Sequence, residues 1–341
     1  MRDNFLRNPL VPPWYRPPHV LFLDDNSAFL RNLTLGLETN KITFKTFDDP
    51  QTTIEYIKRS TSSPLGGKKN LIPSNDFLPA DIEHSIISTQ EEIYNPERFD
   101  EISILVVDYA MPHFNGLQVC NEIRKLEKPI KLLMLTGEAD EKIGVEAFNN
   151  GEIDQFMRKD APDFANLLNN KILDLQKKYY LDISTIILTQ LTSSSQMPIV
   201  SNLYQKEFTE FFNKILKEND IAEYYLIDSY GSFILLDFNG KPFWFFIKKE
   251  EDMEEVYNIA KHKNEKFPAQ LLNAMKNREK ILCLYKKNIW NDPDEAEKFL
   301  FPASRVEGKN TYYYTLVSDP NLFDFTAQNI ISFKHYKKSR E

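Results

Sequence analysis

The stretch ISILVVDYAMPHFNG, residues 102–116, decides the fold of the first half of the chain. It opens with a continuous apolar run rich in β-branched side chains, and that run ends at Asp108. Such runs are typical of strands that are buried on both faces, and these strands belong to parallel sheets covered by helices on both sides. We therefore expect alternating strands and helices around residues 102–108.

The expected alternation is present on both sides of this strand. Segments with strand character lie at 19–25, 42–49, 130–137 and 153–159, and segments with helical character lie at 26–38, 50–60, 115–127, 140–151 and 162–180. We therefore predict an α/β domain over residues 19–180 with a doubly wound, five-stranded parallel sheet. In such a sheet a ligand binds in the crevice at the carboxyl ends of the strands.

Three other segments of the first 200 residues do not fit this alternation. Residues 1–18 are rich in proline, which opposes helix formation, so we expect an N-terminal arm. Residues 60–100 are rich in Ser, Pro, Gly and Asn and are too long for a simple connection. We expect them to form an insertion that is partly disordered or carries a small helix near Gln90, and we expect residues 181–200 to form a linker.

Residues 201–341 change character and predict an α+β domain. A helix is expected at 202–218, strands at 224–228, 231–238 and 241–249, helices at about 250–263 and 268–280, and strands around 281–285 and 310–317. Asn239-Gly240 is a strong signal for a two-residue hairpin turn. The first three strands therefore predict an antiparallel meander.

Five side chains follow the carboxyl ends of four of the predicted parallel strands. They are Asp24, Asp25, Asp108, Thr136 and Lys159. Two carboxylates about 4 Å apart repel by roughly 4 kcal/mol at an effective dielectric constant of about 20, so three carboxylates require a cation. Oxygen ligands without nearby His or Cys indicate Mg²⁺. A carboxylate beside Mg²⁺ and a lysine can accept a phosphoryl group. The alternative interpretation is that these residues are ordinary acidic side chains on the surface at the strand ends.

These motifs resemble those of the receiver domains of two-component response regulators. They are FLDDN at 22–26, VVDYAMPHFNG at 106–116, LMLTG at 133–137 and FMRK at 156–159. The resemblance covers residues 19–180 and implies a CheY-like fold that takes a phosphoryl group from a sensor histidine kinase. It also implies that the domain catalyses only its own phosphorylation and dephosphorylation, so we expect no other enzymatic activity.

The resemblance further implies the residues of the site. Asp108 would accept the phosphoryl group, and Lys159 would bind it. The Mg²⁺ ligands would be the carboxylates of Asp24, Asp25 and Asp108 and the backbone carbonyl of Ala110, with Asp25 a direct ligand. Asp160 departs from the family, because a proline usually follows the lysine.

A conformational switch would follow phosphorylation. In this family Thr136 would turn toward the phosphoryl group and Phe156 would move inward, which would change the surface of residues 138–151, 153–158 and the helix after Pro162. That surface is commonly a dimer face, and its charges are mixed. They include Glu138, Asp140, Glu141, Lys142, Arg158 and Lys171. We therefore expect a homodimer on phosphorylation, and a solvated polar face is the alternative.

The output of the second domain stays open between two classes. In the first class the domain binds a nucleic acid or a nucleotide. Trp244, on an exposed sheet, would stack on a base, and the phosphates would be bound by Lys248, Lys249, Lys286 and Lys287. A strand that is apolar on both faces is, however, more often buried. The competing class is a protein-interaction output through helix 250–260 and strand 310–317. A receiver with a long insertion, followed by a second half that runs from IDSYGSFILLD at 227–237 to KFLFPASR at 298–305, also resembles quorum-sensing response regulators, which implies control of a cell-density programme.

Composition restricts the remaining possibilities. The formal net charge of -8 argues against a chain dedicated throughout to polyanions. The two cysteines, Cys120 and Cys283, fall in different predicted domains, so neither a disulfide framework nor a Cys-based metal site is expected. No apolar run approaches the roughly 18 residues that would span a bilayer. We therefore expect a cytoplasmic protein without a membrane partner.

Overall fold

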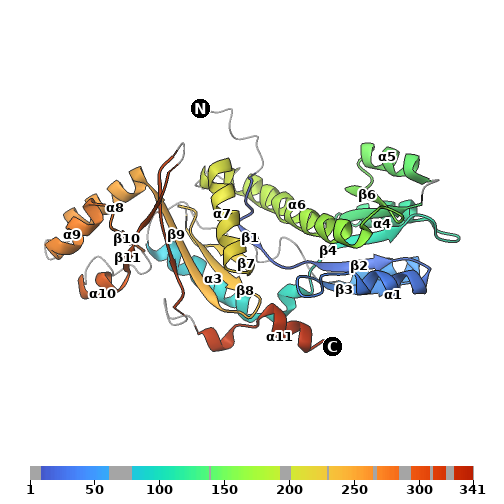
Figure 1. Cartoon of the computed structure of the whole chain (residues 1–341), viewed down its shortest axis with the longest axis horizontal. Coiled ribbons are helices and arrows are strands. Elements are labelled where there is room, and N and C mark those ends of the chain that lie inside the picture. The colour runs from blue at the N-terminus through green and yellow to red at the C-terminus, as the bar shows by residue number, and fades with distance from the viewer. Residues whose placement is uncertain are drawn as a thin grey trace. The chain divides into compact units, whose positions relative to one another are not determined.

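The computed structural model of the 341-residue chain describes residues 9–60, 79–137, 140–192, 201–228, 230–263, 267–283, 293–307, 310–319 and 326–340. Two compact units are present, and each is assembled from separate stretches of the chain (Figure 1). The parallel-sheet unit comprises residues 16–66, 96–184 and 336–341. The antiparallel-sheet unit comprises residues 1–15, 67–95 and 185–335.

The parallel-sheet unit contains the predicted five-stranded sheet, with the order β3-β2-β4-β5-β6. Its strands are β2 (His19–Leu23), β3 (Thr43–Phe47), β4 (Ile102–Asp108), β5 (Lys131–Thr136) and β6 (Gln155–Arg158). All neighbouring strands run parallel. The prediction of a CheY-like, doubly wound sheet is therefore confirmed.

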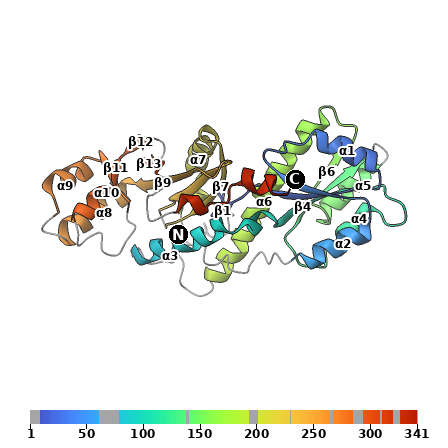
Figure 2. The same ribbon diagram turned by 90° about the horizontal axis from the view of Figure 1, so that it is seen from below.

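Helices cover both faces of this sheet (Figure 2). They are α1 (Ser27–Leu35), α2 (Pro50–Arg59), α4 (Gly116–Arg124), α5 (Glu141–Asn149) and α6 (Phe164–Thr192). α1 and α6 share one buried core with Val106, whereas α2, α4 and α5 share another with Val107. Successive residues of a strand point to opposite faces, so this one strand contributes to both cores.

Local sequence explains where several of these helices begin. The Asn26 side chain accepts hydrogen bonds from the backbone N–H groups of Ala28 and Phe29 at the start of α1. Asn115 and Gln118 form a reciprocal capping box at the start of α4.

α6 continues to Thr192, so part of the stretch expected to be a linker is helical. Residues 181–192 contain neither Gly nor Pro to end the helix. Residues 193–200 lie outside the described ranges.

The antiparallel-sheet unit is built on a six-stranded sheet with the order β1-β7-β8-β9-β13-β12. Its strands are β1 (Trp14–Tyr15), β7 (Ile221–Leu226), β8 (Phe233–Asp237), β9 (Pro242–Lys249), β12 (Ser304–Val306) and β13 (Tyr312–Val317). β7, β8 and β9 form the predicted meander. At the hairpin turn Gly240 has a φ of 83°, a left-handed conformation that glycine adopts readily. The Gly240 N–H donates to the carbonyl of Asp237.

The other elements of this unit surround the sheet. They are α3 (Pro79–Tyr94), η4 (Ser201–Tyr204), α7 (Lys206–Glu218), α8 (Glu250–Lys263), α9 (Ala269–Lys276), α10 (Pro293–Lys298), η6 (Ala327–Asn329) and the small sheet of β10 (Lys280–Leu282) and β11 (Leu300–Pro302). The last helix, α11 (Phe333–Lys338), has residues in each unit. Among the described residues, no helix combines the length and apolarity that a membrane span requires.

The N-terminal arm and the insertion have definite structure where they are described. Trp14 and Tyr15 pair with Tyr225 and Tyr224 as an antiparallel edge strand, so this part of the arm belongs to a sheet. The insertion contains α3, which is longer than the expected small helix, and its Ile86 and Ile93 are buried. Residues 61–78 of the insertion lie outside the described ranges.

A buried ionic group secures the chain where it enters the parallel-sheet unit. Arg16 is 1% exposed and donates to the Glu101 carboxylate at 2.5 Å. The other Glu101 oxygen accepts a hydrogen bond from the Tyr179 hydroxyl at 2.6 Å, and the Arg16 guanidinium donates to the Tyr180 hydroxyl at 3.2 Å. Burying charge costs free energy unless the charge is paired and hydrogen-bonded, and here residues far apart in sequence provide both.

We expect Arg16→Leu to lower the free energy of opening of β4 by about 3–5 kcal/mol, because Glu101 would stay buried without this cation. Native-state hydrogen exchange of peptides from β4 measures this quantity. Arg59→Leu is the control, because its ion pair with Glu55 is exposed and should contribute less than about 1 kcal/mol. Equal effects of the two substitutions would contradict the importance of the buried group.

Candidate functional site

Three carboxylates meet at the carboxyl ends of β2 and β4. One oxygen each from Asp24, Asp25 and Asp108 lies within 4.8 Å of the other two. Strand register explains the meeting, because Leu23 pairs with Val107, and so the next residue of each strand lies at the same edge of the sheet. Asp24 and Asp108 are buried, whereas Asp25 is exposed. The group is therefore open to solvent on one side.

Lys159 binds two of these carboxylates. Its Nζ lies 2.7 Å from Oδ2 of Asp24 and 2.9 Å from Oδ1 of Asp108. Burial raises the pKa of Asp24 above its ordinary value, although the hydrogen bond from Lys159 opposes this shift. Burial lowers the pKa of Lys159, but the hydrogen bonds to Asp24 and Asp108 outweigh it and raise that pKa overall. Lys159 therefore offers a permanent positive charge at neutral pH.

Thr136 and Phe156 lie on the same face of neighbouring strands. Phe156 pairs with Met134, and Thr136 follows two residues later in the same strand. The Thr136 hydroxyl is buried and has no hydrogen-bond partner among the described residues. Phe156 is half-buried and packs edge-on to Phe148, with ring centroids 6.5 Å apart. A Cβ added to Gly144 of α5 would approach the Phe156 ring to 3.0 Å, so a larger residue there would press on the ring.

Gly116 allows the loop after Asp108 to turn back onto its own strand. Its N–H donates to the carbonyl of Tyr109 at 3.0 Å. A Cβ on Gly116 would lie 2.2 Å from the backbone carbonyl oxygen of Asp108, which no side chain can tolerate. Ala110 is exposed within this loop, and Met111 is buried in the core beneath it. The glycine is therefore required by the close approach of the loop to the Asp108 backbone.

The loop after β6 is held by an ion pair in place of the proline typical of the family. Arg158 donates from Nε and from an Nη to the two carboxylate oxygens of Asp160, at 2.9 and 2.6 Å. Arg158 also contacts Glu141 of α5 at 3.3 Å. None of the described residues has a cis peptide bond. The ion pair therefore joins the two residues that flank Lys159 in the sequence.

Phe29 is part of this site, although helical periodicity indicates only a core position for it. The Nζ of Lys159 lies 4.4 Å from the centroid of the Phe29 ring. No sequence signal marks this contact, because Phe29 and Lys159 lie on segments far apart in the chain.

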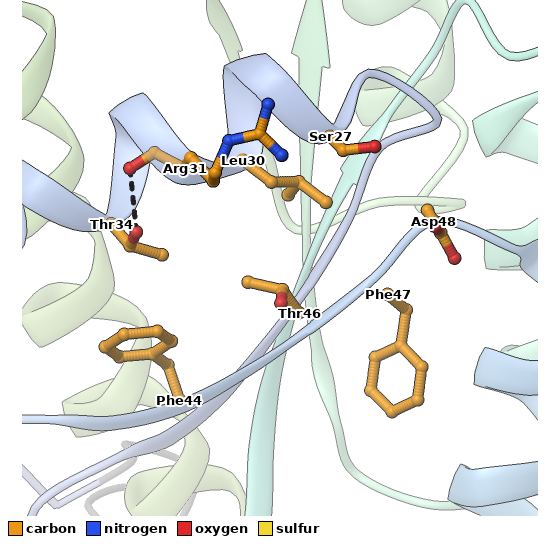
Figure 3. Close-up of a pocket in the computed structure, with 8 residues that line it drawn as sticks. All are labelled: Ser27, Leu30, Arg31, Thr34, Phe44, Thr46, Phe47 and Asp48. Atoms are coloured by element: carbon orange, nitrogen blue, oxygen red, sulfur yellow. Dashed lines mark hydrogen bonds between the residues drawn. The ribbon is translucent and has the colours of Figure 1, made fainter.

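A surface pocket of about 340 Å³ lies between α1 and β3 (Figure 3). It is lined by Ser27, Leu30, Arg31, Thr34, Phe44, Thr46, Phe47 and Asp48. The backbone N–H of Asp24 donates to the carbonyl of Phe47 at 3.1 Å, so the pocket adjoins the carboxylate group. None of the sequence motifs marks this pocket.

Two of the residues considered for nucleic-acid binding, Trp244 and Lys248, lie in the interior of the antiparallel-sheet unit. Trp244 is completely buried and Lys248 is 3% exposed, with its Nζ 3.5 Å from the centroid of the Tyr230 ring. Both lie on β9, which pairs with β8 and β13 and is therefore an inner strand. Lys249 is half-buried and donates to the Ser201 hydroxyl at 2.9 Å. Lys286 and Lys287 lie outside the described ranges.

Comparison with known proteins supports the same assignment as the fold and the site. The model of the response regulator receiver domain family matches residues 81–170. Among solved structures, the Legionella pneumophila response regulator LqsR is 31% identical, covers 98% of both chains and superposes with a TM-score of 0.78. This chain belongs to the response regulators that carry a receiver domain. No curated protein matches it.

Two further solved structures resemble only part of the chain. An adenylate cyclase from Rhodopirellula baltica is 22% identical, covers 50% of this chain and 96% of its own, and has a TM-score of 0.37. A response regulator receiver domain protein from Clostridium thermocellum is 18% identical, covers 48% of this chain and 98% of its own, and has a TM-score of 0.34.

We expect Gly116→Ala to weaken Mg²⁺ binding by about tenfold or more, because the added Cβ must displace the Asp108 backbone. Isothermal titration with MgCl₂ measures the affinity, and circular dichroism confirms that the variant is folded. Gly151→Ala is the matched control, since its Cβ would meet nothing within 4 Å, although its φ of +73° adds some strain. Unchanged Mg²⁺ affinity in folded Gly116→Ala would show that the loop does not position Asp108.

Proposed function

We propose that this response regulator is switched by phosphorylation of Asp108, with a sensor histidine kinase as the donor and Mg²⁺ as the cofactor. The observation that carries the proposal is the group of three carboxylates within 4.8 Å, with the Lys159 ammonium between Asp24 and Asp108. Carboxylates with no binding role would be more stable farther apart, because they repel each other. A site that binds a cation and a phosphoryl group requires them close together.

The donor set fits a hard divalent cation. Asp24, Asp25, Asp108 and the backbone carbonyl of Ala110 would hold Mg²⁺, and all of these groups offer oxygen. Bound Mg²⁺ would supply positive charge that balances the equatorial oxygens of the phosphoryl group during transfer. Because the pKa of Asp24 is raised, we expect proton competition for this site to begin at a higher pH than for an ordinary aspartate.

The transfer itself needs one nucleophile and one fixed positive charge from the chain. An Asp108 carboxylate oxygen attacks phosphorus, forming a P–O bond while the P–N bond to the donor imidazole breaks, and the leaving nitrogen keeps that electron pair. Lys159, already 2.9 Å from Asp108, then bonds a phosphoryl oxygen. Lys159 acts as a cation and not as an acid, because its pKa is raised.

The switch would use groups that are already poised beside the site. The Thr136 hydroxyl has no partner among the described residues, so a phosphoryl oxygen would satisfy it. Movement of Thr136 would free space on the face that it shares with Phe156. Phe156 contacts α5 at Gly144 and Phe148, so its movement would alter the α5 surface.

Wild-type protein incubated with Mg²⁺ and acetyl phosphate should acquire one acid-stable, base-labile phosphate, whereas Asp108→Asn should acquire none. Phosphate content by intact mass provides the measurement. Asp48→Asn serves as the control, because Asp48 is an exposed carboxylate next to a strand end and lies outside the proposed site. Labelling of Asp108→Asn at the wild-type level would refute Asp108 as the acceptor.

We also propose that phosphorylation promotes homodimerisation through the surface of α5 and α6. Three large apolar side chains are exposed there: Val145 is 41% exposed, Phe148 48% and Leu167 41%. Charged side chains of this surface, such as Arg158 and Glu141, already form ion pairs with each other. Burial of the exposed apolar side chains would therefore contribute most to dimerisation.

Phe148→Glu should therefore stay monomeric after phosphorylation while it still accepts phosphate, because a buried charge would oppose the interface. Sedimentation velocity with and without acetyl phosphate tests this expectation. Leu35→Glu, at an 86% exposed leucine that belongs to α1 and not to α5 or α6, should dimerise as the wild type does. A monomeric wild type under both conditions would refute phosphorylation-dependent dimerisation.

For the output we propose a protein-interaction function within quorum-sensing signalling. The burial of Trp244 and Lys248 removes two groups on which nucleic-acid binding would rely, which favours the competing class. The place in a cell-density programme rests on the resemblance of the whole layout to quorum-sensing response regulators. Retention on heparin that is lost as salt rises would instead support nucleic-acid binding.

A further inference from the structure

Lys159 lies in a loop that lacks the usual support for its position. In this family a proline commonly follows the lysine, and its ring restricts the backbone. Here Asp160 follows, and its partner Arg158 has a side chain that is 33% exposed, so this ion pair is partly screened by water. A flexible lysine side chain beside such a loop needs a second restraint if its ammonium is to stay at the carboxylates.

The Phe29 ring provides this restraint. It lies beneath the ammonium, with the Lys159 Nζ 4.4 Å from the ring centroid. The negative face of an aromatic ring attracts a cation at this distance, and the attraction strengthens where water is partly excluded. The Asp24 and Asp108 oxygens bind the same ammonium at 2.7 and 2.9 Å. The cation is therefore contacted by two carboxylates and by one aromatic face.

The ring is itself held in place by two elements. The backbone N–H of Phe29 donates to the Asn26 side chain at 3.0 Å, which fixes the first turn of α1. Its ring packs edge-on against Phe164 at the start of α6, with centroids 6.1 Å apart and an interplanar angle of 66°. Because Asn26 and Phe164 position the ring, its position does not depend on the Lys159 ammonium. The ring can therefore hold Lys159 while the other partners of that lysine change.

We propose that Phe29 is a positioning residue for phosphoryl binding, holding the Lys159 ammonium over its ring at the mouth of the carboxylate group. This inference rests on the proposed phosphorylation of Asp108. During transfer Lys159 exchanges its carboxylate partners for a phosphoryl oxygen, and the ring is the contact that persists through that exchange. Phe29 touches neither the metal ligands nor the phosphoryl group in this role.

The test compares substitutions that separate ring chemistry from ring volume. Phe29→Leu keeps an apolar side chain but removes the aromatic face, whereas Phe29→Trp and Phe29→Tyr keep such a face, and that of tryptophan attracts cations most strongly. Phe44→Leu is the matched control, because Phe44 is also half-buried and packs edge-on to Phe22 at 6.1 Å, but no cation of the described residues lies over its ring.

Two measurements are made on each full-length variant with saturating Mg²⁺. The first is the rate of phosphorylation as a function of acetyl phosphate concentration. The second is the affinity for beryllofluoride, an anion of phosphoryl shape, followed by fluorine NMR. We expect Phe29→Leu to raise the half-saturating acetyl phosphate concentration and the beryllofluoride Kd by about two- to fivefold, while the limiting rate changes less than about twofold.

The variants with an aromatic ring should rescue the effect. Phe29→Trp and Phe29→Tyr are expected within about twofold of wild type in both measurements, and Phe44→Leu is expected to match wild type. Wild-type behaviour of Phe29→Leu would overturn the inference, and so would equal impairment of Phe29→Leu, Phe29→Tyr and Phe29→Trp, because both results exclude a role for the aromatic face.

The two arms also separate this inference from the proposed function. If the wild type binds beryllofluoride but is not labelled on Asp108, the proposal that Asp108 is phosphorylated is refuted. The beryllofluoride affinities of the variants then still decide the role of Phe29. If the wild type binds no beryllofluoride, both proposals are overturned. Normal labelling with no difference among the variants overturns the role of Phe29 alone.

Discussion

Repulsion among three carboxylates at one edge of a parallel sheet is the constraint on which the rest of the site depends. Asp24 and Asp108 are both buried and lie at the ends of neighbouring strands, so the register of the sheet keeps their carboxylates close together. Lys159 offsets this repulsion in the structure by binding both carboxylates. A cation therefore stabilises the site, and this property suits the site to hold Mg²⁺ and a phosphoryl group, as proposed.

The surroundings of the carboxylates connect this charge balance to the protein surface. Thr136 offers a buried hydroxyl with no partner in the described part of the chain, and it shares a sheet face with Phe156. Phe156 in turn contacts α5 through the space left by Gly144. In the proposed switch, a change of charge at Asp108 would reach exposed apolar side chains such as Phe148 through these packed groups, without unfolding any element.

Much of the parallel-sheet unit could be predicted because its signals are local. Each strand is a short apolar run, and most helices begin at a cap or a proline such as Asn26 or Pro50. The carboxylates were predictable as a group because the ends of parallel strands meet at one edge. The buried state of Trp244 was harder to decide, because its strand carries aromatic residues on both faces, and such a run fits an inner strand as well as an exposed aromatic surface.

By itself, the sequence determined the order of strands and helices in the parallel-sheet unit, the meeting of three carboxylates at one edge of its sheet and the family, because these follow from periodicity, turn residues and residue type at strand ends. Tertiary structure alone decided that Trp14 and Tyr15 form an edge strand, that α3 joins the antiparallel-sheet unit, and that Phe29 lies beneath Lys159. These outcomes depend on partners far away in the chain, and no local pattern encodes the identity of a distant neighbour.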